Sequence, residues 1–246
     1  MLKLITLITK IILVTLAALL VSSCNYSVNM NAVKGSGNVT TETRQIDQDF
    51  NSIDVSNSID VIIEQADNFE VKVEADDNLQ DEIKIKVENG VLIIESDDRS
   101  FMDVSAKTVF VKMPLIQDLH ASSSATIKSA KTIKASNIDI SSSSAAEINI
   151  AVEADNIKCK ATSGSDLYLE GLALALEVTA SSGSEIKTAD LPANEITAKS
   201  SSGASIKVHP ILSLKARASS GSEITYVKTP KTIEKKESSG ASISKE

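Results

Sequence analysis

The sequence predicts an all-β fold, a right-handed parallel β-helix (β-solenoid) with coils of about 19 residues. A motif close to Ser-Ser-Gly-Ser, ending in Ile or Leu, recurs through the second half of the chain, and its closing residue returns at intervals of 21, 19, 19, 20, 18 and 19 residues. So steady a period is typical of solenoids. Between the motifs apolar and polar residues alternate, as in strands with one buried face. Parallel crossovers are nearly always right-handed. The closing residues are Ile127, Ile148, Leu167, Ile186, Ile206, Ile224 and Ile243.

Residues 1–23 have the features of a secretory signal peptide. Lys3 and Lys10 flank the start of an apolar stretch that runs to Val21, and no acidic residue occurs before Cys24. An uncleaved transmembrane helix is the less favoured alternative, because the apolar stretch has about half of the ~20 residues that a membrane span requires.

The segment Val21-Ser22-Ser23-Cys24 resembles the lipobox of bacterial lipoproteins. The resemblance implies cleavage after Ser23 and a diacylglycerol group on the sulfur of Cys24, so it predicts a membrane partner held through lipid and a place in the cell envelope, at the outer membrane. A disulfide between Cys24 and Cys159 would require an unlipidated Cys24. We therefore expect Cys159 to be a buried thiol in a strand.

Charge and composition exclude some classes of function. Cleavage of residues 1–23 would remove two lysines and change the formal net charge from −8 to −10. A chain this acidic, without a basic stripe, is a poor candidate for binding nucleic acid. The chain has no tryptophan and few other aromatic residues, so its core must be built from Ile, Val, Leu, Ala and Ser.

Four segments follow from these patterns. They are the signal peptide (1–23), a lipidated tether (24–45), an N-terminal β region of irregular coils and hairpins (46–118) and the repetitive β-helix (119–246). Within the third segment, Asn89-Gly90 separates two alternating stretches, which indicates a hairpin. In the last repeat Lys235 and Glu237 take interior positions, which indicates a polar terminal cap.

The repeat motif predicts how each coil bends. If alternation continues unbroken, Leu172, Leu174 and Leu176 face the interior together with Ser182 and Ile186. Glycine would permit a positive φ or tight curvature at the bend, at the positions Gly164, Gly183, Gly203, Gly221 and Gly240. Buried serines would stack into an internal column and hydrogen bond along it, at the positions Ser163, Ser182, Ser202, Ser220 and Ser239.

Several short motifs occur in a fixed order along the chain. They are Gly35-Ser36-Gly37-Asn38-Val39, Asn89-Gly90-Val91-Leu92 and Met113-Pro114, followed by the serial Ser-Gly-Ser motifs. This series resembles the GIN domain family of auto-transporter adhesin heads. The resemblance covers nearly all of residues 33–246. It implies a β-solenoid in a cell-envelope lipoprotein of Gram-negative bacteria, and it supplies no catalytic residues. The chain departs from the family at Ser124 and Ala145, which replace glycine in the first two coils.

No catalytic residue, metal site or cofactor is predicted. His120 and His209 fall at different phases of the repeat, without a neighbouring Cys or His. Glu147, Asp166 and Glu185 should form a vertical carboxylate column on the outer face. That column could bind calcium or act on a polysaccharide, but we favour a solvated face balanced by nearby lysines, because the spacing of a calcium loop is absent.

The leading interpretation is a non-enzymatic envelope lipoprotein whose β-helix is an adhesin-like binding surface for an extracellular or envelope protein or glycan. Two alternatives remain open. One is a structural envelope protein that faces the periplasm, and the other is a glycan-active β-helix enzyme. The enzyme is disfavoured because the sequence has no cluster of acid and base residues.

Overall fold

The structure is a computed structural model that describes Lys10, Thr15, residues 33–96 and residues 101–246. The cleavage position Ser23 and the lipidation position Cys24 lie outside these described residues. Residues 33–246 form one compact unit. No helix in the described part of the chain is long and apolar enough to cross a membrane.

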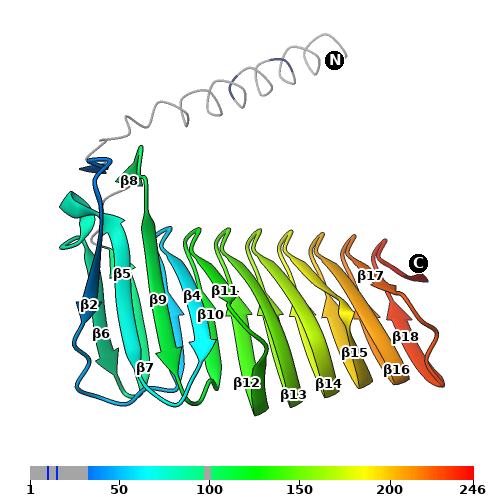
Figure 1. Ribbon diagram of the computed structural model, residues 1–246. Helices are drawn as coiled ribbons and strands as arrows, with labels where there is room; N and C mark the ends of the chain where they lie inside the picture. Colours follow the sequence, from blue (N-terminus) through cyan, green and yellow to red (C-terminus); the bar gives the residue numbers. More distant parts are fainter. Residues whose placement is uncertain (1–9, 11–14, 16–32, 97–100) are drawn as a thin grey trace. The chain divides into compact units, whose positions relative to one another are not determined.

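The compact unit is the predicted β-solenoid, with stacked parallel coils in about seven turns spaced about 19 residues apart (Figure 1). Closing residues pair between neighbouring coils, as Ile148 does with Leu167 and Leu167 with Ile186. The strands of the stack are β10 (Asp118–Ala121), β11 (Thr126–Ser129), β12 (Ile133–Ser142), β13 (Glu147–Ala161), β14 (Asp166–Ala180), β15 (Glu185–Ser200), β16 (Ser205–Ala218), β17 (Glu223–Tyr226), β18 (Thr232–Glu237) and β19 (Ser242–Lys245).

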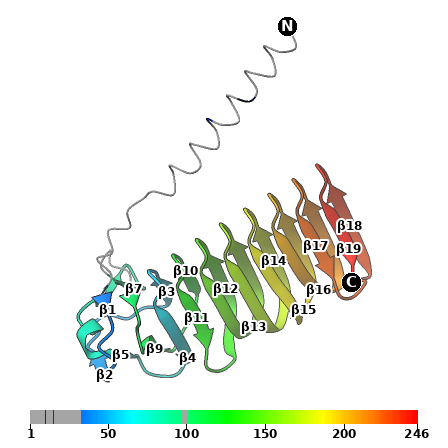
Figure 2. The ribbon, with the colours of Figure 1, turned by 90° about the horizontal axis from the view of Figure 1, so that it is seen from above.

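The N-terminal strands continue the stack and then close its end. Strands β3 (Ser52–Val55) and β4 (Asp60–Gln65) pair in parallel with β10 and β11. Strands β6 (Ile83–Glu88) and β7 (Val91–Ser96) form an antiparallel hairpin around Asn89 and Gly90, whose φ angles are 53° and 80°. The remaining elements are β1 (Val33–Lys34), β2 (Val39–Arg44), β5 (Glu70–Asp76), the 3₁₀ turn η1 (Asp77–Leu79), β8 (Phe101–Met102) and β9 (Lys107–Met113). From above, the coils follow one another in a row from this region to β18 (Figure 2).

The tether predicted over residues 24–45 is too long. Strand β1 pairs with β8, and β2 pairs with β5 in antiparallel register from Val39 to Arg44. The side chains of β2 are mostly exposed, so backbone hydrogen bonds rather than apolar burial hold it in the sheet. Strand β2 was therefore not predicted, because its sequence is polar and lacks the apolar alternation of a half-buried strand.

The interior does not keep one alternation phase around a coil. Leu172 and Leu174, expected inside, are 56% and 55% exposed, while Ala173 between them is buried. Inward side chains stand at odd positions up to Ala173 and at even positions from Leu176 onward. The corner between these two residues shifts the phase by one residue. A coil of 19 residues requires such a shift, because an odd number of residues cannot alternate without a break.

At the bend, two consecutive residues adopt positive φ. Ser182 and Gly183 have φ of 56° and 70°, and the other glycine coils repeat this pair. Ser124 and Ala145, which replace glycine, make the same turn at φ of 61°. The five predicted bend glycines occupy its second position, with φ between 67° and 73°.

The predicted internal serine column is wrong by two residues. The left-handed conformation turns the first residue of the bend toward solvent, so all five serines of that column are exposed: Ser163, Ser182, Ser202, Ser220 and Ser239. In three coils the serine after the bend glycine is buried instead, at Ser165, Ser184 and Ser222. Ser184 donates its hydroxyl to the carbonyl of Ala161 at 2.8 Å and accepts the N–H of Ser181 at 3.1 Å.

One serine and one alanine share the two interior positions that flank the bend. Ala180 precedes Ser184, whereas Ser200 precedes Ala204 and donates its hydroxyl to the carbonyl of Ala204 at 2.9 Å. The same exchange occurs in three further coils, as Ser142 with Ala146, Ala161 with Ser165, and Ala218 with Ser222. In each of these coils one hydroxyl occupies the narrow end of the core.

Two charged side chains cover the end of the stack. Lys235 donates to the carbonyl oxygen of Ile243 at 3.0 Å, and its Nζ lies 4.7 Å from the centroid of the Tyr226 ring. Glu237 accepts the backbone N–H of Ile243 at 2.7 Å. These two residues continue the interior rows of Ala216 and Ala218. The terminal cap is therefore formed by polar groups that satisfy the last coil's own backbone.

Candidate functional site

In-register stacking converts each outward position of the repeat into a column of side chains. Neighbouring parallel strands lie about 4.8 Å apart, so equivalent residues in successive coils are close neighbours. Side chains that could act together on the surface therefore lie at equivalent positions of successive coils. The strand register identifies the residues of each column.

The predicted carboxylate column is present. Glu147 pairs in register with Asp166, and Asp166 with Glu185. Partial burial, followed by the charges of Glu185 and Glu147, raises the pKa of Asp166 above its ordinary value. A proton is thus held more tightly at the middle of the column than on an isolated aspartate.

A lysine on the next column partly balances these charges. The Nζ of Lys187 lies 2.7 Å from a carboxylate oxygen of Glu185 and 5.0 Å from the centroid of the Tyr168 ring. Within the described residues, no group of three or more His, Cys, Asp or Glu side chains is arranged to hold a metal ion. The arrangement supports an ion-paired outer face.

The two histidines and Cys159, the other side chains that could take part in catalysis or metal binding, lie apart from one another. His120 Nδ1 is 2.7 Å from the hydroxyl oxygen of Ser141 in the next coil, and His209 Nδ1 is 2.9 Å from the carbonyl oxygen of Ala189. Cys159 is buried, and burial raises the pKa of its thiol far above the ordinary range. A buried thiol of this kind is inert as a nucleophile.

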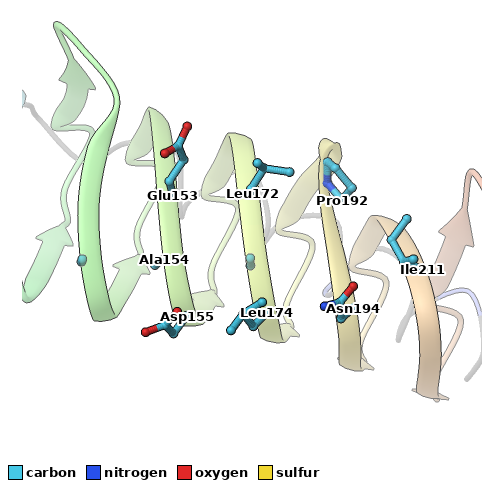
Figure 3. Close-up of a pocket in the computed structure, with 10 residues that line it drawn as sticks. Glu153, Ala154, Asp155, Leu172, Leu174, Pro192, Asn194 and Ile211 are labelled. Atoms are coloured by element: carbon cyan, nitrogen blue, oxygen red, sulfur yellow. The ribbon is translucent and has the colours of Figure 1, made fainter.

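The most distinctive surface is an apolar groove along the corners of strands β13 to β16 (Figure 3). The groove is open to solvent and has a volume of about 450 Å³. Leu172, Pro192 and Ile211 follow one another across three coils, and Leu174 lies below Leu172 on the same strand (Figure 3). Leu212, the residue after Ile211, is also exposed.

Polar groups border the groove at one end and on its lower side. Glu153 pairs in register with Leu172, and Asp155 lies lower on the same strand (Figure 3). Lys134 lies 3.6 Å from Glu153, whereas Asp155 has no ion-pair partner in the described part of the chain. The groove is thus mainly aliphatic, with the polar residue Asn194 on β15 and acidic residues at the β13 end.

The sequence does not predict this groove, because unbroken alternation places Leu172 and Leu174 in the core. The odd length of the coil does indicate such a surface, because it requires the alternation of inward and outward side chains to shift by one residue at some corner. Three consecutive alternate leucines beginning directly after Gly171 marked the corner where it occurs.

A family model described as "Putative auto-transporter adhesin, head GIN domain" matches residues 49–230 of the chain. No curated protein matches the chain in sequence.

Solved structures from three species share the fold. A protein from Bacteroides fragilis described as a putative adhesin aligns with a TM-score of 0.81 at 17% identity, over 87% of this chain and 100% of its own. A protein from Parabacteroides distasonis described as a putative lipid binding protein gives 0.72 at 22% identity, over 87% and 99%. A putative adhesin from Parabacteroides merdae gives 0.70 at 20% identity, over 87% and 99%.

Proposed function

The chain belongs to the auto-transporter adhesin head GIN domain family, and from that premise we propose that it is a non-enzymatic binding module of the cell envelope. In this proposal lipid on Cys24 holds the chain at the outer membrane, and the coil stack is the contact surface. The chemistry of the described residues supports binding rather than catalysis, because their histidines, buried thiol and carboxylates do not converge on one site.

The exposed apolar groove is the observation that carries this proposal. Leu172 and Leu174 are more than half exposed, although the same coil buries its other leucines. Burial of one such side chain contributes about 1.5–3 kcal/mol. Contiguous exposed apolar surface with a polar border is typical of interaction sites.

The lining of the groove favours a protein as the occupant. Its apolar residues are aliphatic, without the aromatic faces that stack on sugar rings. Asp155 adds an unpaired negative charge at one end. The chemistry that fits is a partner segment with apolar anchor side chains and a Lys or Arg placed to meet Asp155.

Adherence of whole cells tests the proposal. Bacteria that produce the full chain are added to an epithelial monolayer, with and without prior protease treatment of the monolayer. Leu172→Glu/Leu174→Glu should lower adherence about tenfold or more, because two apolar anchors are lost. Leu115→Glu is the matched control, since Leu115 is 44% exposed outside the groove. Equal adherence by the groove variant, or adherence that survives protease treatment, would contradict the proposal.

Protease shaving of intact cells tests the placement. Peptides from residues 119–246 should be released without lysis if the stack faces outward. Protection until the outer membrane is opened would instead support a structural protein that faces the periplasm. In parallel, Cys24→Ser should abolish metabolic labelling of the chain with a radioactive fatty acid, and persistent labelling would contradict anchoring at Cys24.

A further inference from the structure

A column of cations runs along another outward row of the coils. The strand register aligns Lys160, Thr179, Lys199, Arg217 and Lys236 on successive strands β13, β14, β15, β16 and β18. Lys199, Arg217 and Lys236 occupy three consecutive coils and are exposed. The prediction that the chain has no basic stripe is therefore wrong. Alignment of the repeats on the Ser-Ser-Gly motif would have revealed it, because each cation stands two residues before that motif.

These cations have little compensation from acidic groups. Lys199 lies 3.2 Å from Glu177, whereas Arg217 and Lys236 have no ion pair among the residues that the structure describes. By contrast, two lysines that align on β15 and β16 after the bend do form ion pairs: Lys187 pairs with Glu185, and Lys207 with Glu246. Like charges directly opposite on neighbouring strands are destabilising. The three neighbouring cations therefore form a positive patch on a chain whose formal net charge is −8. Their mutual repulsion lowers the stability of the fold.

The column also borders a hollow. An open hollow of about 300 Å³ is lined by Thr179, Lys199, Arg217 and Lys236 and by the first serines of successive Ser-Ser-Gly motifs. Those serines are Ser201, Ser219 and Ser238. Hydroxyl groups both donate and accept hydrogen bonds, so they suit a ligand that carries hydroxyls of its own.

We propose that Lys199, Arg217, Lys236 and the hydroxyls beside them bind a linear acidic polysaccharide, whose carboxylate or sulfate groups lie over successive coils. The cations repeat at the spacing of the coils, about 4.8 Å, so they match a chain of regularly spaced anions better than a single ion. Arg217, at the centre, can hold a carboxylate or sulfate through two parallel N–H groups. Serine hydroxyls hydrogen bond to the sugar hydroxyls. The site goes beyond the proposed protein contact and shares no residue with the groove of Leu172 and Leu174.

Titration of the purified full chain with defined polymers tests this proposal. The probes are heparin, which is sulfated, polygalacturonate, which is carboxylated, and dextran, which is neutral. Lys199→Gln/Arg217→Gln/Lys236→Gln should weaken binding to at least one acidic probe by tenfold or more and flatten its dependence on salt. Lys187→Gln/Lys207→Gln/Lys245→Gln removes the same charge at positions outside the cation column and should change binding less than twofold. Dextran should not bind.

Further arms separate this ligand from other polyanions. Vesicles of phosphatidylglycerol and double-stranded DNA are titrated in the same buffer. Binding to vesicles or DNA at least as tight as to the acidic polysaccharides would overturn the assignment, and so would equal losses in the two triple variants. The triple variant of the column should melt at the same or a higher temperature than the parent, because like-charge repulsion is removed. Leu172→Glu/Leu174→Glu should bind the acidic probes normally, so failure of the groove proposal remains distinguishable.

Discussion

The carboxylate of Glu237 accepts the backbone N–H of Ile243 at 2.7 Å, so a side chain of β18 satisfies the backbone of β19 at the end of the stack. Lys235 completes the arrangement through the carbonyl oxygen of the same residue, at 3.0 Å. Ile243 itself is buried beneath these groups. Without them the last coil would present an apolar interior and an unpaired strand edge to other molecules.

Removal of this cap should cause the chain to associate. Lys235→Val/Glu237→Val extends the apolar interior to the open end, and we expect concentration-dependent dimers or larger species by light scattering after gel filtration. Glu234→Val/Lys236→Val changes the same residue types at outward positions of the same strand and should leave the size unchanged. Unchanged size for both variants would show that the cap does not protect the end.

Reciprocal exchange at the bend should move stability in opposite directions. Gly183 and Ala145 occupy the same turn position with φ of 70° and 61°. Because a Cβ in the left-handed region costs about 1–2 kcal/mol, Gly183→Ala should lower the free energy of unfolding by about 1 kcal/mol, and Ala145→Gly should raise it by a similar amount. A Cβ built on Gly183 meets no atom within 4 Å, so packing should not obscure the comparison. Urea unfolding measures both, and shifts of the same sign would refute the backbone explanation.

The exchange of serine and alanine around the bend supports a double-mutant cycle. Ser200→Ala removes the hydroxyl that bonds to the carbonyl of Ala204 and should cost about 1 kcal/mol of unfolding free energy. Ser200→Ala/Ala204→Ser restores one hydroxyl in the arrangement of the neighbouring coil and should recover most of this loss. A double variant less stable than Ser200→Ala alone would show that the two arrangements are not interchangeable.

Asp166 should make stability depend on pH. Its pKa is raised chiefly by burial and then by Glu185 and Glu147, so the folded state holds the proton more tightly than the unfolded chain. The ionised carboxylate therefore destabilises the fold above the folded pKa, and this penalty fades as the pH falls. Asp166→Asn should melt at a higher temperature than the parent at pH 7, with the difference lost below the ordinary pKa of an aspartate. Glu223→Gln, on the same column outside this cluster, is the control, and an equal increase for it would contradict the prediction.

The repeat period predicted the solenoid because each closing residue must stack on the next. The side-chain directions were less predictable, since unbroken alternation was assumed where the chain turns. Two local events changed them, the phase shift between Ala173 and Leu176 and the left-handed pair at Ser182 and Gly183. The first follows from the odd length of the coil and was available in the sequence. The second placed Ser184 inside rather than Ser182, which depends on backbone angles that residue types alone do not specify.

The cation column could not be predicted from the local sequence for a different reason. Lys199, Arg217 and Lys236 are separated in sequence by 18 and 19 residues, and each is unremarkable in its own segment. Only strand register makes them neighbours. The carboxylate column was found because its residues adjoin the motif that defined the repeat, whereas the cation column precedes that motif.

The register of the cation column also bears on how the protein would carry mechanical load. A ligand gripped by a single edge strand would transmit a pull to that strand alone, and its ladder bonds would peel one after another. A polymer that contacts three consecutive coils divides the same force among β15, β16 and β18. Rupture then requires detachment from several coils together, so an attachment made of individually weak contacts can resist shear that would strip an end strand.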